Sequence, residues 1–181
     1  MRKTLEATPS IQRRADFQPH SLELLAPFER ALSAHDLFAA LRVLNGTTRY
    51  RFTGVYSFEP GLVRSVVLYD RENPNLRSGD DVPWFDSYCM LTAENGAECE
   101  IQNSLSDARL TVHAARLKVL SYCAVLLRTP SGEELGTLCH YDVIARKTDP
   151  GIFDGLRACR PAVEVCLWEH LKNRLHALPP D

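Results

Sequence analysis

Alternating apolar and polar positions predict a β-hairpin between Ser121 and Asp142. Two runs rich in Leu, Val, Thr, Tyr and Cys flank Pro130-Ser131-Gly132, where proline presets φ and glycine accepts a positive φ. Side chains alternate between the two faces of a strand. The second strand should therefore place Leu135, Thr137, Cys139 and Tyr141 on one face, and Gly136, Leu138, His140 and Asp142 on the other. We expect one face to meet helices and the other to line whatever the protein encloses.

A second hairpin is predicted nearer the N-terminus, with strands at Tyr50–Phe58 and Leu62–Asp70 joined through Glu59-Pro60-Gly61. The spacing assigns four aromatic residues to one face of its first strand, and such a stripe is more typical of a core than of a ligand box. They are Tyr50, Phe52, Tyr56 and Phe58. Arg49 and Arg51 point the other way and are interpreted as solvated charges at a sheet edge. A shorter strand is predicted at 98–103.

Helical periodicity frames these strands at both ends of the chain. Leucines and Phe28 recur at helical spacing from Ser21 onward, which predicts a helix. Because proline is tolerated in the first turn of a helix and kinks its interior, we expect Pro27 to lie in the first turn or at a kink. The capping pattern Ser33-Ala-His-Asp36 then opens a second helix that stops at Asn45-Gly46. A C-terminal helix follows Asp149-Pro150-Gly151, and we expect Pro161 to divide it. The predicted apolar stripe of that helix is Val163, Cys166, Leu167, His170 and Leu171.

The stretch at 71–83 reads as a long loop, and loops of this length are commonly functional. Asp86 or Ser87 should cap the short helix that follows, which turns Tyr88, Cys89 and Leu91 inward and ends at Asn95-Gly96. For residues 111–120, a short helix and an irregular crossover both fit the pattern.

Composition narrows the choice of partners and location. The 181 residues suit one domain, which we place at 21–178 after a polar N-terminal arm at 1–20. A net charge of −2 gives no reason to expect nucleic acid or an anionic membrane as a partner. No apolar run approaches the roughly 20 residues of a membrane span, and no secretory signal is recognisable. We therefore predict a cytoplasmic protein.

The six cysteines should be reduced thiols in that compartment, several of them acting as small core residues. No Cys-x-x-Cys pair and no Cys/His cluster with zinc spacing occurs. The sequence therefore predicts no metal site.

The element order and three segments resemble the GAF domain family of small-molecule sensors. The segments are Asp81-Val-Pro-Trp-Phe-Asp-Ser-Tyr-Cys89, Glu98-Cys-Glu-Ile-Gln-Asn-Ser-Leu-Ser-Asp-Ala-Arg109 and Gly136-Thr-Leu-Cys-His-Tyr-Asp142, and the resemblance covers roughly 21–178. It implies an α+β fold with a central antiparallel sheet of about five to six strands. The N- and C-terminal helices should cover one face, and a loop and short helix should cover a pocket on the other.

The same resemblance implies a function. Family members bind cyclic nucleotides, bilins, haem or other metabolites, but neither a phytochrome-type attachment cysteine nor a cyclic-nucleotide signature is recognisable here. No segment of the chain resembles an output domain. We therefore predict a small-molecule-binding sensor or regulatory module that acts through a partner or through homodimerisation by its terminal helices. The ligand and any cofactor are unknown. The predicted binding residues are Tyr56, Trp84, Phe85, Tyr88, Cys89, Asp107, Arg109 and Tyr122.

Two alternatives stay open at this point. The first is a ligand-free dimerisation or interaction scaffold. The second is a thiol enzyme, because Cys89, Cys99 and Cys123 have a spacing similar to the three cysteines of free methionine-(R)-sulfoxide reductases. Two observations argue against a thiol enzyme. Cys89 would correspond to the second of those three cysteines, and Cys123 lies within a predicted strand. Such chemistry needs a thiolate and a partner thiol within disulfide reach, and Cys89, early in its helix, is the best candidate for the thiolate.

Overall fold

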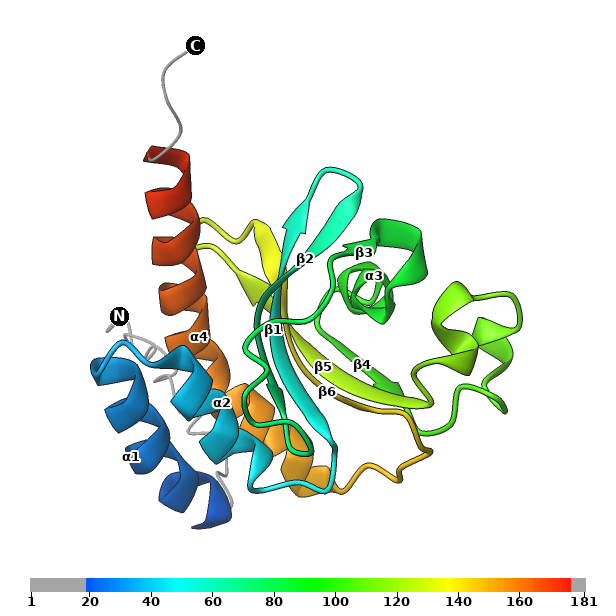
Figure 1. The fold of residues 1–181 in the computed structure, drawn as a ribbon, viewed down its shortest axis with the longest axis horizontal. Coiled ribbons are helices and arrows are strands. Elements are labelled where there is room, and N and C mark those ends of the chain that lie inside the picture. Colours follow the sequence, from blue (N-terminus) through cyan, green and yellow to red (C-terminus); the bar gives the residue numbers. More distant parts are fainter. Residues whose placement is uncertain (1–18, 177–181) are drawn as a thin grey trace, which may run out of the picture.

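A computed structural model describes residues 19–176 and contains an antiparallel six-stranded sheet of order β3-β2-β1-β6-β5-β4. The central hairpins are β1 (Phe52–Glu59) with β2 (Leu62–Asp70), and β5 (Ser121–Arg128) with β6 (Glu134–Asp142). Short strands β3 (Val82–Pro83) and β4 (Glu98–Ile101) form the edges. Helices α1, α2 and α4 lie on one side of the curled sheet and α3 on the other (Figure 1). The expected α+β architecture is confirmed.

Both predicted hairpins form, each with a glycine in its turn. Gly61 and Gly132 have φ of 73° and 91°, the left-handed region that glycine enters without a Cβ clash. The two hairpins join because β1 pairs with β6, and Gly136 allows this close approach. A Cβ at Gly136 would lie only 1.9 Å from the Tyr56 carbonyl oxygen.

The helices begin and end close to their sequence signals. They are α1 (Pro19–Ser33), α2 (Leu37–Asn45) and α4 (Pro150–His176). Asp36 is the N-cap of α2, where its Oδ1 accepts a hydrogen bond of 2.8 Å from the backbone N–H of Ala39. Ser33 belongs to the end of α1 instead, and its hydroxyl donates to the Glu29 carbonyl oxygen at 2.9 Å.

The structure decides two expectations about prolines. Pro27 lies in the interior of α1, which removes the first-turn alternative and leaves the kink as a prediction. The C-terminal helix is not divided at Pro161, because α4 runs through it for 27 residues. Proline removes one backbone hydrogen bond, but buried residues on both sides of Pro161 anchor α4 on the sheet. These residues are Leu156, Cys159, Val163 and Leu167. His170 is exposed and lies outside this stripe.

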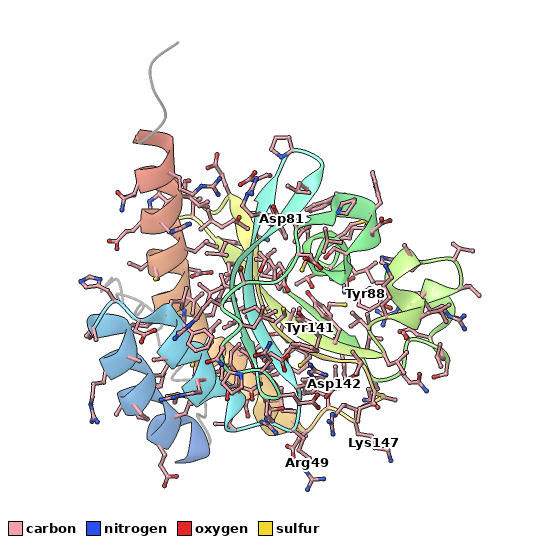
Figure 2. All side chains as sticks on the ribbon, viewed as in Figure 1. Arg49, Asp81, Tyr88, Tyr141, Asp142 and Lys147 are labelled. Carbon is pink, nitrogen blue, oxygen red and sulfur yellow. The ribbon has the colours of Figure 1, made fainter. Side chains whose placement is uncertain are left out.

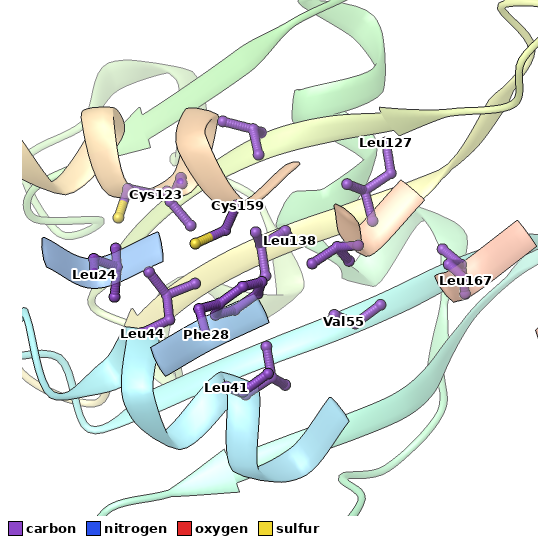
Figure 3. Close-up of a cluster of buried hydrophobic side chains, with 14 of the residues drawn as sticks. Leu24, Phe28, Leu41, Leu44, Val55, Cys123, Leu127, Leu138, Cys159 and Leu167 are labelled. Atoms are coloured by element: carbon purple, nitrogen blue, oxygen red, sulfur yellow. The ribbon is translucent and has the colours of Figure 1, made fainter. Parts of the chain in front are cut away.

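The three long helices and the sheet enclose an apolar core, which we call the helix-face core (Figure 3). Leu138 from β6, Val55 from β1 and Leu167 from α4 are fully buried in it. The predicted aromatic stripe of β1 is broken, because Tyr50 precedes the strand and packs in this core, whereas Tyr56 and Phe58 pack on the opposite face. Leu135 also changes face.

The change of face at Leu135 has a local cause. In the β5–β6 register Leu127 pairs with Gly136 and Arg128 pairs with Glu134, so Leu135 is the extra residue of a bulge. The bulge shifts the alternation and brings Leu135 into the helix-face core.

A buried polar chain fastens α2 to the sheet. The Asn45 side-chain N–H donates to Thr53 Oγ1 at 2.7 Å, and Thr53 Oγ1 lies 2.7 Å from His140 Nδ1. Because the amide N–H can only donate, Thr53 Oγ1 accepts from Asn45, whereas the direction of its hydrogen bond with His140 Nδ1 depends on the tautomer of the imidazole. Burial lowers the pKa of His140 to about 3, with a smaller contribution from the charge of Arg71. His140 is thus a neutral structural group.

The N-terminal arm lies almost wholly outside the described residues, and the domain limits at 21 and 178 stay predictions. Between residues 19 and 176, none of the helices combines the length and the apolar character that crossing a membrane requires. The cytoplasmic location also stays a prediction.

Candidate functional site

The face of the sheet opposite the long helices carries a second core, which we call the pocket-face core. Side chains of β1, β5 and β6 point into it, and segments of the chain between β2 and β5 cover it. The covering elements are η1 (Trp84–Asp86), α3 (Tyr88–Glu94), η2 (Ala108–Leu110) and η3 (Ala114–Leu117). The predicted short helix is confirmed with Ser87 as its cap, because the Ser87 hydroxyl accepts from the Cys89 N–H at 3.2 Å. The undecided stretch 111–120 contains the short 3₁₀ turn η3.

A cavity of about 120 Å³ lies within the pocket-face core. Figure 2 shows Tyr88 on α3 and Tyr141 on β6 in the region between the sheet and its cover. The lining residues are Tyr56, Val82, Asp86, Ser87, Tyr88, Cys89, Ala115, Val119, Tyr122, Cys139 and Tyr141. Among the described residues, no Lys or Arg lines this cavity. Its wall therefore consists of tyrosine rings, small aliphatic side chains, hydroxyls and two thiols, with a single carboxylate.

The four tyrosine hydroxyls of the wall have partners within the protein. Tyr56 and Tyr141 share a hydrogen bond of 3.1 Å between their hydroxyls. Tyr88 donates to the Val119 carbonyl oxygen at 3.2 Å, and the Tyr122 hydroxyl lies 3.1 Å from Thr92 Oγ1. Burial raises the pKa of all four phenols above the usual value of 10. The wall therefore offers neutral hydroxyls at physiological pH.

Cys89 receives several hydrogen bonds at the inner end of α3. Thr137 Oγ1 donates to Cys89 Sγ at 3.1 Å, and the Tyr122 hydroxyl donates to the same sulfur at 3.5 Å. The hydrogen bond from the Cys139 thiol, together with those from Ser87, Thr137 and Tyr122, lowers the pKa of Cys89 although its burial acts in the opposite direction. For Cys139, burial and its hydrogen bond to Cys89 raise the pKa. Cys89 thus has the more stable thiolate of the pair.

The three cysteines of the reductase alternative do not share this site. Cys99 is buried in the pocket-face core outside the cavity lining, and burial raises its pKa to about 11. Cys123 lies on the other side of the sheet, in the helix-face core, where burial raises its pKa to about 12. The sheet itself separates Cys123 from Cys89, because neighbouring residues of β5 alternate between the two faces.

The structure brings four of the eight predicted binding residues together around the cavity: Tyr56, Tyr88, Cys89 and Tyr122. Trp84 packs edge-on against Phe58, with ring centroids 4.9 Å apart, and Phe85 is 77% exposed. Asp107 and Arg109 form an ion pair of 2.6 Å, and the Arg109 guanidinium also donates to the Glu100 carbonyl oxygen at 2.8 Å. The other four predicted residues lie outside the cavity lining; they are Trp84, Phe85, Asp107 and Arg109.

The sequence interpretation did not select seven other lining residues: Val82, Asp86, Ser87, Ala115, Val119, Cys139 and Tyr141. A signal for Cys139 and Tyr141 was present in the alternation of β6. In the β5–β6 register Tyr141 lies opposite Tyr122, and Cys139 lies opposite Ala124. Once Tyr122 is assigned to the pocket, the pairing of the hairpin places Tyr141 beside it.

Elsewhere in the described residues there is a further groove, and no group that could bind a metal. A larger groove of about 1400 Å³ lies at the end of the helix layer, and its lining mixes charges of both signs, such as Glu23, Arg49, Lys147 and Asp149. It borders the start of the described chain near α1. Within residues 19–176, no group of three or more His, Cys, Asp or Glu side chains is placed to hold a metal ion.

Comparison with known proteins identifies the fold. No family model and no curated protein matches the sequence. Among solved structures, the GAF domain of a phosphoenolpyruvate-protein phosphotransferase from Acinetobacter is similar with a TM-score of 0.69, at 10% identity over 87% of this chain and 99% of that one.

Two further structures support the same assignment. The phycocyanobilin-bound GAF domain of a cyanobacterial phytochrome has a TM-score of 0.64, at 13% identity over 84% of this chain and 96% of its own. The type II free methionine-R-sulfoxide reductase of Thermoplasma acidophilum has a TM-score of 0.58, at 16% identity over 78% and 95%. The arrangement of strands and covering elements is therefore the GAF fold.

Proposed function

We propose that this GAF-fold chain is a small-molecule-binding regulatory module whose ligand occupies the cavity between β6 and α3. The observation that carries the proposal is the cavity itself, which is lined by four tyrosines, two cysteines and no cationic side chain among the described residues. Pockets that combine apolar walls with a few convergent polar groups are the usual binding sites of small molecules. The bilin-bound phytochrome domain is an example of this fold with a ligand.

The volume limits the ligand to a compact molecule. A cavity of about 120 Å³ corresponds to roughly four waters at about 30 Å³ each, and a cavity of about 150 Å³ in another protein accepts benzene. Drug-sized ligands occupy about 300–1,000 Å³. A ligand of up to roughly six non-hydrogen atoms thus fits this conformation, whereas a bilin or a nucleotide would require the cover to move.

The wall chemistry favours a neutral ligand with a hydrogen-bond acceptor. The Tyr56–Tyr141 hydroxyl pair uses one of its two protons in the mutual hydrogen bond, so the other stays available to donate. An anionic ligand would find no lysine or arginine among the described lining residues to compensate its desolvation. Small amides and alcohols match these requirements.

The test fills the cavity with a bulky side chain introduced on the elements that cover it. Ala115 lines the cavity on η3, whereas the neighbouring Ala114 is exposed and does not. In a thermal-shift screen with small amides and alcohols, we expect stabilisation of the original protein and of Ala114→Trp. Ala115→Trp should fold and lose the effect, and Phe85→Ser, altered at an exposed residue, should retain it. Equal stabilisation of Ala115→Trp would place binding elsewhere.

A ligand-free dimerisation scaffold is the second candidate, because the cavity is small and every tyrosine hydroxyl already has a partner. The screen separates the two: a scaffold shows no stabilisation by any compound. In both cases we propose a homodimer through α1 and α4, since Val165 on α4 is 58% exposed. Native mass spectrometry of the full chain checks that assembly.

A further inference from the structure

Two thiols meet in the cavity from opposite walls. Cys89 is the second residue of α3, and Cys139 lies near the middle of β6. They are 3% and 0% exposed, and both line the cavity. The Cys139 thiol donates a hydrogen bond of 3.7 Å to the Gly54 carbonyl oxygen. Two free thiols that line one small cavity are an arrangement that redox chemistry can use.

The surroundings favour a negative charge on Cys89 alone. Hydroxyl donors from Thr137 on β6 and Tyr122 on β5 converge on its sulfur, and hydrogen bonds to a charged acceptor are the strong ones. The other cysteines lack this support. Burial raises the pKa of Cys99, Cys123, Cys159 and Cys166. Because the thiolate is the nucleophilic form of cysteine, Cys89 should react first.

We propose that Cys89 and Cys139 form a redox-active pair that reacts with a small hydroperoxide and closes to a disulfide. This inference rests on the proposed function, since it requires a small molecule to enter the same cavity, and it names the chemical class of that molecule. Hydrogen peroxide has two heavy atoms and fits a volume of about 120 Å³, whereas bulky lipid hydroperoxides do not.

The reaction balances in two steps. The Cys89 thiolate attacks the terminal oxygen of the hydroperoxide, an S–O bond forms, the O–O bond breaks, and the departing alkoxide or hydroxide takes a proton from solvent. Cys89 is then a sulfenic acid. The Cys139 sulfur attacks Cys89, the S–O bond breaks, and the hydroxyl group leaves as water with the Cys139 proton. The two sulfurs together lose two electrons, and the peroxide gains them.

The geometry suits both steps. The hydroperoxide can enter where Asp86, Ala115 and Val119 line the cavity, because these residues are exposed or half-buried. Cys89 and Cys139 line the same cavity, and Cys89 Sγ lies 3.1 Å from the hydroxyl of Thr137, which is two residues before Cys139 on the same face of β6. A shift of the short helix α3 toward β6 would then bring the two sulfurs to the bonded distance of about 2.05 Å. Cys99 packs in the same core but does not line the cavity.

The test is peptide mapping of the full-length protein under non-reducing conditions after treatment with hydrogen peroxide at neutral pH. We expect one cross-linked peptide pair containing Cys89 and Cys139, with the loss of two hydrogens. Cys139→Ser should give no disulfide and leave a sulfenic acid at Cys89 that a 1,3-dione traps. Cys89→Ser should give neither product. Cys123→Ser, altered on the opposite face of the sheet, should form the same disulfide within about twofold of the original rate.

Other outcomes would overturn the inference. These are a disulfide that involves Cys99 or Cys166, or no oxidation of Cys89 at peroxide concentrations that oxidise free cysteine. Mapping of the unmodified protein decides this even if a variant fails to fold. The fragment screen on the reduced protein keeps the two proposals distinguishable. Stabilisation by fragments without disulfide formation rejects the redox pair and retains the binding cavity.

Discussion

The two faces of the sheet are built from the same strands but have different chemistry. On β6, Leu138 packs in the helix-face core, whereas its neighbour Cys139 lines the cavity on the pocket face. The helix-face core consists mainly of aliphatic side chains packed between three helices and the sheet (Figure 3). The pocket-face core is rich in tyrosine and cysteine and encloses an unfilled volume. Because side chains alternate between the two faces of a strand, β6 contributes both to the packed core and to the cavity wall.

The difference has an energetic consequence. A fully buried leucine stabilises the fold by about 1.5–3 kcal/mol through removal of apolar surface from water. A hydrogen bond between buried hydroxyls contributes only about 0.5–1.5 kcal/mol net. We infer that the helix face supplies most of the stability, so that the pocket face can keep a cavity and polar groups at a modest cost.

The largest predicted difference is between two adjacent residues of β6. Leu138→Ala should lower the free energy of unfolding by about 2–5 kcal/mol, because it leaves a cavity in a close-packed core. Cys139→Ala removes one sulfur atom beside an existing cavity, and we expect a loss of about 1 kcal/mol. Urea unfolding of both variants measures the difference. Equal losses would mean that the two cores are equally packed.

The elements of the fold were predictable because their signals are local. The hairpin turns, the Asp36 and Ser87 caps and the alternation of β6 follow from neighbouring residues. The errors arose where tertiary packing overrides a local preference. Pro161 did not end α4, because the helix is held on the sheet on both sides of it. Leu135 changed face because a bulge interrupts the alternation.

The site was predictable in part, for a related reason. Tyr56 and Tyr122 lie on strands, and their direction follows from the period of two. Phe85 and Arg109 lie in the cover, where no periodicity fixes which way a side chain points, and neither lines the cavity. The alternation grouped Cys139 with Thr137 and Tyr141 on one face of β6, but the role of Cys139 depends on α3, which approaches it from a distant part of the chain.

The pair of tyrosine hydroxyls on neighbouring strands β1 and β6 provides a smaller and more specific test of the pocket face. Tyr56→Phe or Tyr141→Phe should each lower the free energy of unfolding by about 1–3 kcal/mol, because the remaining buried hydroxyl loses its partner. The double variant leaves no orphaned hydroxyl. It should therefore cost less than the sum of the single variants, with a coupling of about 0.5–3 kcal/mol. Additive losses in a double-mutant cycle would show that the two hydroxyls act independently.

The smallest predicted effect returns to β6 and its helix face, where His140 is held neutral. Burial lowers the pKa of His140 to about 3, against about 6.5 in an unfolded chain. Between these values the unfolded state binds more protons, so stability is fully present above pH 6.5 and declines as the pH falls toward 3. From pH 6 to pH 5 the contribution of His140 should fall by about 1 kcal/mol.

The variant His140→Gln isolates the contribution of His140 to the pH dependence of stability. Burial also lowers the pKa of His113, but His113 and other groups titrate alike in the original protein and in the variant. The difference in unfolding free energy between the two proteins should therefore shrink by about 1 kcal/mol from pH 6 to pH 5. Urea unfolding at the two pH values measures it. A constant difference would mean that His140 can be protonated inside the folded protein. The helix face would then tolerate charge, and the contrast between the two faces would not extend to electrostatics.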